Sequence, residues 1–435
     1  MLSENEITEV LGEEVLPDAK AQWGRLNMWT KKRTGMMVKT WTPDGADLEY
    51  KDFARKARTP WLKFAARVIA QAIHIDGYST SETWERGWLA TGMDGRQATL
   101  NRDVINNGYS YLLTFPDEAG DPFMRHLPAS KTFSLKEDPW DDDPWLVLHK
   151  VSERKPNGRG ADFHRLFDDE AMYEIHGDIL RPDKINIVPH ELGVTPVSMI
   201  STGFYDDDDD LPESPVAIGL AAYHRLVDAT FTLLMIGRYG AFPQKYQSGG
   251  VIATDEDGNA LVRPSVDSLL HSQDFETKFG TFQAADIDKA VAAVDEQFEE
   301  LTAILQVPAH YLQGKIINVS SDALAASEAG FMRLTKSIQR SMKAGYGRSF
   351  RNAELLLGIT PDHTAEISFE DVTTRSLSAA TDAVQKLIAS GAAPEDAFQL
   401  VPAWSKQQAL RAASTAAPDT PDTPAGGAGN PELRS

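Results

Sequence analysis

Five consecutive aspartates at residues 206–210 form a run with the chemistry of a cation site. Carboxylate oxygens suit hard divalent cations, and a metal ion held there would support phosphoryl transfer. Adjacent residues cannot all point at one ion, and the run lacks the Asp-x-Asp-x-Asp-Gly spacing of a calcium loop. Runs of like charge more often form solvated, self-repelling loops. We therefore expect a surface loop from Asp206 to Asp210, with a metal-dependent phosphoryl-transfer enzyme as the alternative.

Three further catalytic motifs are absent from the sequence. His190-Glu191 begins "HELGV", but no second histidine follows four residues after the first, as a zinc protease requires. There is no Gly-x-x-x-x-Gly-Lys-Ser/Thr phosphate loop and no Gly-x-Ser-x-Gly elbow. The chain has no cysteine, which excludes disulfides, thiolate nucleophiles and Cys-ligated metals. We expect no catalytic residue, no metal and no cofactor.

The charge of the chain limits the partners that it can hold tightly. The 435 residues carry a formal net charge of −21, whereas a static nucleic-acid binder usually presents a basic surface. Any contact with DNA should therefore be loose or confined to local basic patches. The most apolar run, residues 229–237, is far shorter than the roughly 20 residues that a membrane helix needs. The acidic N-terminus has no signal-peptide pattern, and we expect no membrane partner.

The most regular helical pattern lies at residues 285–306. Its apolar residues are spaced alternately four and three apart, which is a heptad seam typical of a helix packed lengthwise on other helices. The opposite side of this helix is acidic. A second helix, expected at 216–239, is apolar nearly all round and should be buried on most sides. The seam consists of Ile287, Val291, Val294, Phe298, Leu301 and Leu305.

A loop interrupts two long helices after the seam. Pro308 cannot continue the first helix, because proline has no N–H to donate and its ring clashes with the preceding turn. Ser320, Ser321 and Asp322 offer caps for a second helix, which should run to Leu357. The stretch between them holds polar and β-branched residues and has no obvious core to join.

The helix expected after this loop has two faces. One is apolar and consists of Leu334, Ile338, Met342, Tyr346, Phe350 and Ala353. The opposite arc is a basic stripe of Arg333, Lys336, Arg340, Lys343, Arg348 and Arg351. Such a stripe either stays solvated, pairs with acidic neighbours or contacts phosphates, and the sequence leaves these alternatives open.

The remaining patterns indicate an α+β protein. Residues 5–120 are mainly helical, and alternating patterns then predict strands at 145–153, 163–175 and 195–202. Two short helices are expected within 376–414, the second beginning at Pro394. Residues 415–435 are rich in Pro, Gly, Thr and Asp, have almost nothing to bury and should be disordered.

The order of these parts resembles the portal proteins of tailed bacteriophages, in particular the Gp6-like portals of long-tailed phages. The resemblance covers most of residues 20–410 and rests on the order and spacing of several segments. They are "WLKFAARVIAQAIHIDGY", "NNGYSYLLTF", "HELGVTPVSMIS", "AAYHRLVDATFTLLMIGRYGAFPQ", "LTAILQVPAHYLQG", "SSDALAASEAGFMRLTKSIQRS" and "TTRSLSAATDAVQKLIASG".

This resemblance implies a ring, usually of twelve subunits, with an axial channel for DNA at one capsid vertex. It implies a mainly helical wing and crown, a two-helix stem, a small α/β clip and a long helix that follows a tunnel loop. The corresponding ranges are 1–215 for the wing, 216–240 and 284–307 for the stem helices, 241–283 for the clip, 308–319 for the tunnel loop, 320–375 for the long helix returning to the wing, 376–414 for the crown and 415–435 for the tail.

The resemblance also implies roles for residues and partners. The seam would pack subunits together, and the basic stripe would meet DNA or a neighbouring subunit. The implied partners are further copies of this chain, the major capsid protein, the terminase large subunit, the head–tail adaptor and double-stranded DNA. The protein would lie in the virion and, during assembly, in the host cytoplasm. A non-portal capsid scaffold or adaptor is a further alternative. The tunnel-loop candidates for DNA contact are His310, Tyr311, Gln313, Lys315 and Asn318.

Overall fold

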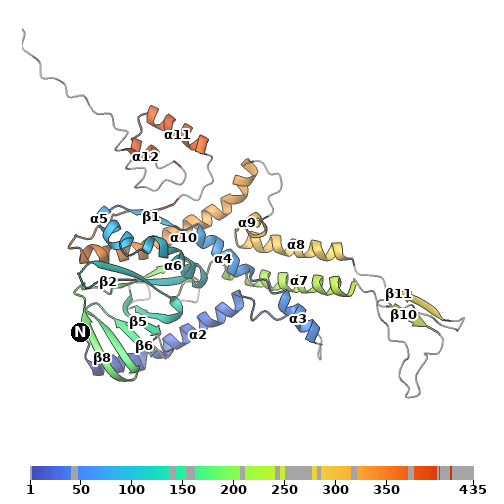
Figure 1. Cartoon of the computed structure of the whole chain (residues 1–435), viewed down its shortest axis with the longest axis horizontal. Coiled ribbons are helices and arrows are strands. Elements are labelled where there is room, and N and C mark those ends of the chain that lie inside the picture. The colour runs from blue at the N-terminus through green and yellow to red at the C-terminus, as the bar shows by residue number, and fades with distance from the viewer. Residues whose placement is uncertain are drawn as a thin grey trace, which may run out of the picture.

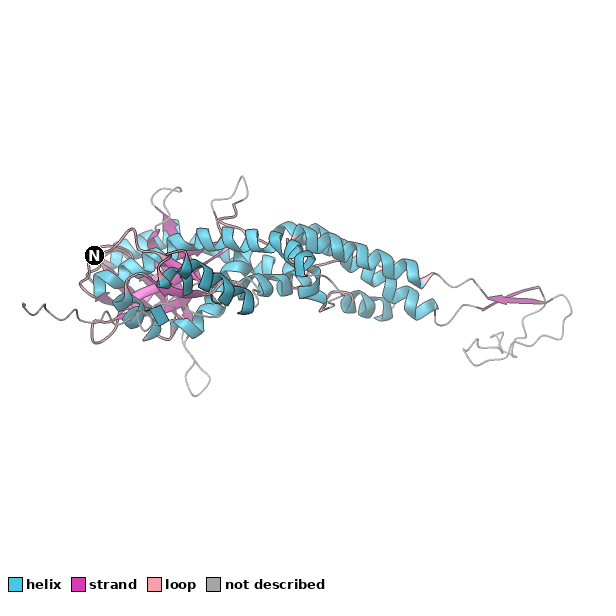
Figure 2. Ribbon diagram, turned by 90° about the horizontal axis from the view of Figure 1, so that it is seen from above, coloured by secondary structure: helices cyan, strands magenta, loops and turns pink. Residues whose placement is uncertain are grey.

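A long two-helix arm extends from a mixed helical and β-sheet body in the computed structural model of the chain (Figures 1 and 2). The arm consists of α7 (Leu220–Gly240) and α8 (Ile287–Ile304), which pack along each other. The α+β class predicted from the sequence is thus confirmed. The structure describes residues 2–40, 48–136, 144–152, 162–205, 211–240, 245–249, 277–281, 286–314, 321–370, 377–398, 401 and 412–413.

Helices of the first hundred residues cover the sheets of the body. Ser3 caps α1 through a capping box with Glu6, which satisfies free N–H groups of the first turn. The turn that ends α6 needs Gly108, whose φ of +90° favours glycine. The helices are α1 (Glu4–Val10), the π-helix Leu11–Val15, α2 (Leu16–Arg33), α3 (Leu48–Lys56), α4 (Trp61–Gln71), α5 (Ser81–Thr83), the π-helix Trp84–Leu89 and α6 (Met93–Asn107).

The described strands form four antiparallel sheets. The largest has the order β4-β5-β6-β7-β8 and consists of β4 (Thr132–Lys136), β5 (Pro144–Ser152), β6 (Asp162–Phe167), β7 (Ala171–Asp178) and β8 (Arg181–Pro189). The second has the order β3-β2-β9, from β3 (Pro122–Leu127), β2 (Tyr109–Pro116) and β9 (Val197–Ser201). The two small sheets pair β1 (Ile75–Tyr78) with β12 (Ile367–Phe369) and β10 (Lys245–Ser248) with β11 (Lys278–Thr281). Two 3-10 turns, Ala129–Lys131 and Ala217–Gly219, complete these regions.

One strand prediction was wrong. The single strand expected at 163–175 is a hairpin, because Asp168 turns the chain between β6 and β7. The Asp168 carboxylate accepts hydrogen bonds from the backbone N–H groups of Glu170 and Ala171, at 2.9 and 2.7 Å. Aspartate forms such turns because its short side chain reaches the N–H groups that follow it. The strands expected at 145–153 and 195–202 are β5 and β9.

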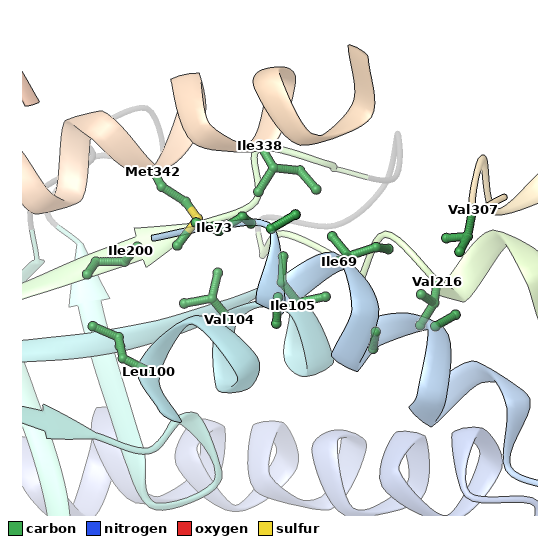
Figure 3. Packing of buried hydrophobic residues seen from close by; sticks show 14 of the residues in the cluster. Ile69, Ile73, Leu100, Val104, Ile105, Ile200, Val216, Val307, Ile338 and Met342 are labelled. Atoms are coloured by element: carbon green, nitrogen blue, oxygen red, sulfur yellow. The ribbon is translucent and has the colours of Figure 1, made fainter. Parts of the chain in front are cut away.

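The long helix α10 (Ser321–Leu356) runs through the main hydrophobic core. Figure 3 shows Ile338 and Met342 on its inner face, above Ile73 and Val104. The apolar face predicted for this helix is confirmed, since Ile338, Met342, Tyr346, Phe350 and Ala353 are buried and Leu334 packs against them. Beyond α10 lie α11 (Leu377–Ala389) and α12 (Pro394–Phe398), and the second begins at the predicted Pro394.

None of the helices in the described part of the chain combines the length and the apolar character that a bilayer crossing needs. The predictions for the Asp206–Asp210 run and for the tail 415–435 fall outside the described residues. Most of residues 241–283 are also outside them, apart from the β10–β11 ribbon at the end of the arm (Figure 2).

Candidate functional site

The chain changes direction twice between the arm and the long helix. α8 ends at Ile304, and Gln306 then takes a positive φ of +53°, which is uncommon for a residue other than glycine. Pro308 caps a short helix, α9 (Ala309–Gln313), and Gly314 ends it with a φ of +67°. The predicted helix break before residue 308 and the restart at Ser321 are both confirmed.

The segment after Pro308 packs onto its own chain, which corrects the expectation that it has no core to join. Leu312 is buried in the main core, and Tyr311 packs against it. The Tyr311 ring meets Phe331 of α10 edge-on, with ring centroids 5.5 Å apart. The local sequence "PAHYLQG" gives no sign of this contact, because its partner lies on α10 across the intervening loop.

Glu328 of α10 holds the two aromatic residues of α9. The Tyr311 hydroxyl donates a 2.9 Å hydrogen bond to its Oε1, and Nε2 of His310 lies 3.6 Å from the same oxygen. Burial, with a smaller contribution from Glu328, raises the pKa of Tyr311 to about 12, so the phenol stays protonated and can donate at physiological pH. Of the five predicted loop contacts, the exposed one that is described is Gln313, while Lys315 and Asn318 lie outside the described residues.

The predicted seam divides into two halves. Phe298, Leu301 and Leu305 are buried within the chain itself, and Phe298 meets Trp61 of α4 edge-on at 4.9 Å. Within the chain, Trp61 of α4 and helix α7 lie against this half. The role of the seam in joining subunits stays a prediction. The other half remains open, with Ile287 44% and Val291 41% exposed, and Val294 partly buried between them and Phe298.

The predicted basic stripe is also divided. Arg333, Lys336, Arg340 and Lys343 are exposed, and none of the four forms an ion pair or side-chain hydrogen bond with another described residue. Arg348 is buried and Arg351 is half-buried, so the stripe is not exposed along its whole length. The helix enters the body at this point, so neighbouring elements surround both of its sides.

Two buried polar clusters were missed in the sequence. Glu354, fully buried on α10, accepts hydrogen bonds from Tyr78, Thr80 and the Asp362 backbone at 2.9–3.0 Å. Its partners lie up to 276 residues away, and no local pattern identifies them.

The second cluster has the residue types of a catalytic triad without its geometry. Ser110 Oγ lies 2.9 Å from Nε2 of His126 and 2.7 Å from the Asp103 carboxylate. The same Nε2 is 3.4 Å from Asp103, so the histidine does not connect the serine to the carboxylate through its two nitrogens. Ser110 is also fully buried, which makes this a structural network.

The described residues contain no group of three or more His, Asp or Glu side chains arranged to hold a metal ion. His190, from the "HELGV" segment, is buried and its Nε2 lies 3.1 Å from the backbone oxygen of Asp168. Burial lowers the pKa of His190, which favours its neutral form.

Comparisons with known proteins give two related sequences. The chain is 28% identical over 354 residues to the portal protein of Mycobacterium phage D29, in an alignment covering 74% of this chain and 71% of that protein. It is 27% identical over 219 residues to the portal protein of Mycobacterium phage L5, covering 47% of this chain and 44% of that one. No protein-family model matches the chain.

Among solved structures, a chain from the virion of a native gene transfer agent particle superposes with a TM-score of 0.45 at 16% identity, covering 84% of this chain and 95% of that one. A chain from the neck of the native particle gives 0.44 at 15% identity, with 84% and 95% coverage. Likeness at this level carries no functional argument. In sequence, the chain is similar over 74% of its length to a protein named as a phage portal protein.

Proposed function

We propose that the chain forms the portal ring at one capsid vertex of a tailed phage, with a channel for DNA packaging and ejection. The observation that carries the proposal is the relationship to a portal protein over 74% of the chain. The arm of α7 and α8, followed by the α9 corner and the long α10, agrees with the order of parts that the resemblance implied.

We assign the parts of the ring on this basis. α7 and α8 form the stem, residues 241–283 the clip, residues 308–319 the tunnel loop, and α11 with α12 the crown. Residues 1–215 and the long helix returning through 375 form the wing. Twelve subunits are proposed from the family resemblance, and the terminase large subunit, head–tail adaptor and major capsid protein are the proposed partners in the virion and during its assembly in the host cytoplasm.

The tunnel loop is proposed to touch passing DNA through its exposed residues. Tyr311 and His310 are held against Glu328, so the exposed Gln313 is better placed for this contact than they are. The proposed contacts are light, which suits a channel through which DNA must slide. Among the described residues, nothing favours an enzyme or a non-portal scaffold.

Negative-stain imaging of the purified chain tests the ring. We expect closed rings with a central hole wide enough for duplex DNA. A monomer, or an assembly without a hole, would contradict the proposal.

Deletion of residues 313–317 tests the tunnel loop. Rings should still form, but phage carrying the deletion should package or retain DNA poorly. Normal packaging and retention would refute the loop assignment alone.

A further inference from the structure

Besides the basic stripe of α10, this acidic protein has a second strongly basic region near its N-terminus. Residues 31–67 contain ten Lys and Arg against four Asp and Glu, a formal charge of +6 within a chain of −21. The described part of this region includes α3, whose Leu48, Lys51 and Arg55 are spaced three and four residues apart and are exposed, Leu48 by 83%. Residues at this spacing share one face of a helix. Lys56 adds a further exposed cation.

Among the described residues, one carboxylate pairs with the cations of this face of α3. Asp52 pairs with Arg55 at 2.5 Å and with Lys56 at 2.7 Å, both at the surface. Lys51 forms no ion pair or side-chain hydrogen bond with a described residue. We call Leu48, Lys51, Arg55 and Lys56 the α3 face. It combines an exposed leucine with excess positive charge, a composition that fits a protein partner carrying carboxylates beside apolar side chains.

The arm itself carries a surface of that composition. Asp288, Asp295 and Glu299 of α8 are seven and four residues apart, so they lie within about 20° of one line along the helix. All three are exposed, and none forms an ion pair with a described residue. Ile287 and Val291, the open half of the seam, are exposed beside this acidic row, along one of its sides. We call these five residues the α8 face.

The two faces belong to helices that lie on different sides of α7. α7 packs along α8 and also against α3, and Figure 1 shows α7 between them. A ring requires such an arrangement, because each subunit must offer one surface to the neighbour on one side and a complementary surface to the neighbour on the other. Complementary charge also opposes the wrong pairing of like faces.

We propose that the α8 face of each subunit docks on the α3 face of the next subunit, forming a head-to-tail contact at the level of the stem. The occupant of each face is thus a second copy of this chain. The inference rests on the proposed ring and deepens it, because it names the surfaces that join the subunits. It also gives a role to the half of the seam that the chain leaves uncovered.

Charge reversal in the full-length chain tests the contact. Variant A carries Asp288→Lys, Asp295→Lys and Glu299→Lys, so both of its faces are basic. Variant B carries Lys51→Glu, Arg55→Glu and Lys56→Glu, so both are acidic. Each variant alone brings like charges together, and we expect the ring fraction in sedimentation to fall about tenfold or more. An equimolar mixture restores attraction at every junction, and rings in which A and B alternate should form again.

A matched control reverses three exposed cations elsewhere. Arg96→Glu and Arg102→Glu on α6 and Lys184→Glu on β8 change the net charge as much as variant B does, and rings should persist. Thermal melting of each variant shows whether its subunit still folds. If the control also abolishes rings, bulk charge is responsible and the inference fails. The inference is also overturned if variant A alone and variant B alone each form rings at the wild-type yield.

Zero-length carbodiimide cross-linking of the unmodified chain gives an independent readout. It joins carboxylates to lysines in direct contact, and a mixture of isotope-labelled and unlabelled subunits identifies links between copies. We expect links from Asp288, Asp295 or Glu299 to Lys51 or Lys56 of another copy. Rings without such links would overturn this contact while leaving the portal function intact, whereas absence of rings in the wild type would contradict the portal function itself.

If variant B assembles normally but loses affinity for duplex DNA, the α3 face binds nucleic acid and the inference is wrong.

Discussion

The Tyr311 hydroxyl donates a 2.9 Å hydrogen bond to Oε1 of Glu328, which fastens the short helix α9 to the long helix α10. The two residues lie on either side of the part of the loop that is outside the described residues. Their bond fixes the position of α9 against α10, so its loss should loosen α9.

Tyr311→Phe removes this bond and keeps the ring that packs on Phe331. We expect unfolding to become easier by about 1 kcal/mol, since a partly buried hydrogen bond contributes roughly that much. Amide hydrogen exchange in residues 309–313 should accelerate more than exchange in α8. Gln313→Ala, at an exposed position of the same helix, is the control and should change neither quantity. Unaltered exchange in Tyr311→Phe would show that packing alone holds α9.

Two glycines of α10 should respond oppositely to alanine. A Cβ added at Gly345 would lie 2.2 Å from the backbone oxygen of Met199 and 2.9 Å from Cα of Ile200, so β9 would have to move. We expect Gly345→Ala to lower the free energy of unfolding by at least about 2 kcal/mol.

Gly330→Ala in the same helix is the matched comparison. A Cβ there meets nothing within 4 Å, so alanine should stabilise the chain by about 0.5–1 kcal/mol through its better helix propensity. Denaturant titration measures both variants. Equal effects at the two positions would mean that α10 does not approach β9 as closely as described.

The two halves of the α8 seam should differ in what they stabilise. Phe298 is 3% exposed, and Phe298→Ala should cost the subunit about 3–5 kcal/mol of folding free energy. Val291→Ala removes a side chain from the open half and should cost the isolated subunit less than about 1 kcal/mol. Denaturant unfolding of unassembled subunits separates them. A large loss from Val291→Ala there would show that this half is covered within the chain.

Buried His149 should make the subunit sensitive to mild acid. Burial, aided by nearby Arg165, Lys131 and other cations, lowers its pKa to about 3. Below about pH 6.5 this histidine binds a proton in the unfolded chain but stays neutral in the folded chain. The free energy of unfolding therefore falls as the pH drops toward 3, by up to about 1.4 kcal/mol per pH unit.

His149→Asn should therefore flatten the loss of stability between about pH 6 and pH 4. Part of the slope should remain, because burial also lowers the pKa values of His164 and His190. The exposed His363→Asn is the control and should keep the wild-type slope. An unchanged slope in His149→Asn would indicate that this imidazole is solvated in the folded chain.

Local chemistry in the sequence determined where the elements begin and end. Heptad spacing predicted the helix that became α8, Pro308 predicted its interruption, and alternation predicted β5 and β9. These features act within a few residues, because periodicity, capping and the missing N–H of proline are properties of neighbouring positions. The relationship to portal proteins could likewise be inferred from the order of segments.

Tertiary structure alone decided what covers each face. The heptad pattern shows that Phe298 is buried, but not that Trp61 of the same chain buries it. The heptad pattern also cannot show that Ile287 is exposed. Ile287 and Phe298 both occupy seam positions of the heptad pattern and differ only in the elements that fold against them. The burial of Arg348 could not be predicted for the same reason, because helix periodicity assigns a direction and only long-range packing decides whether protein or water lies there.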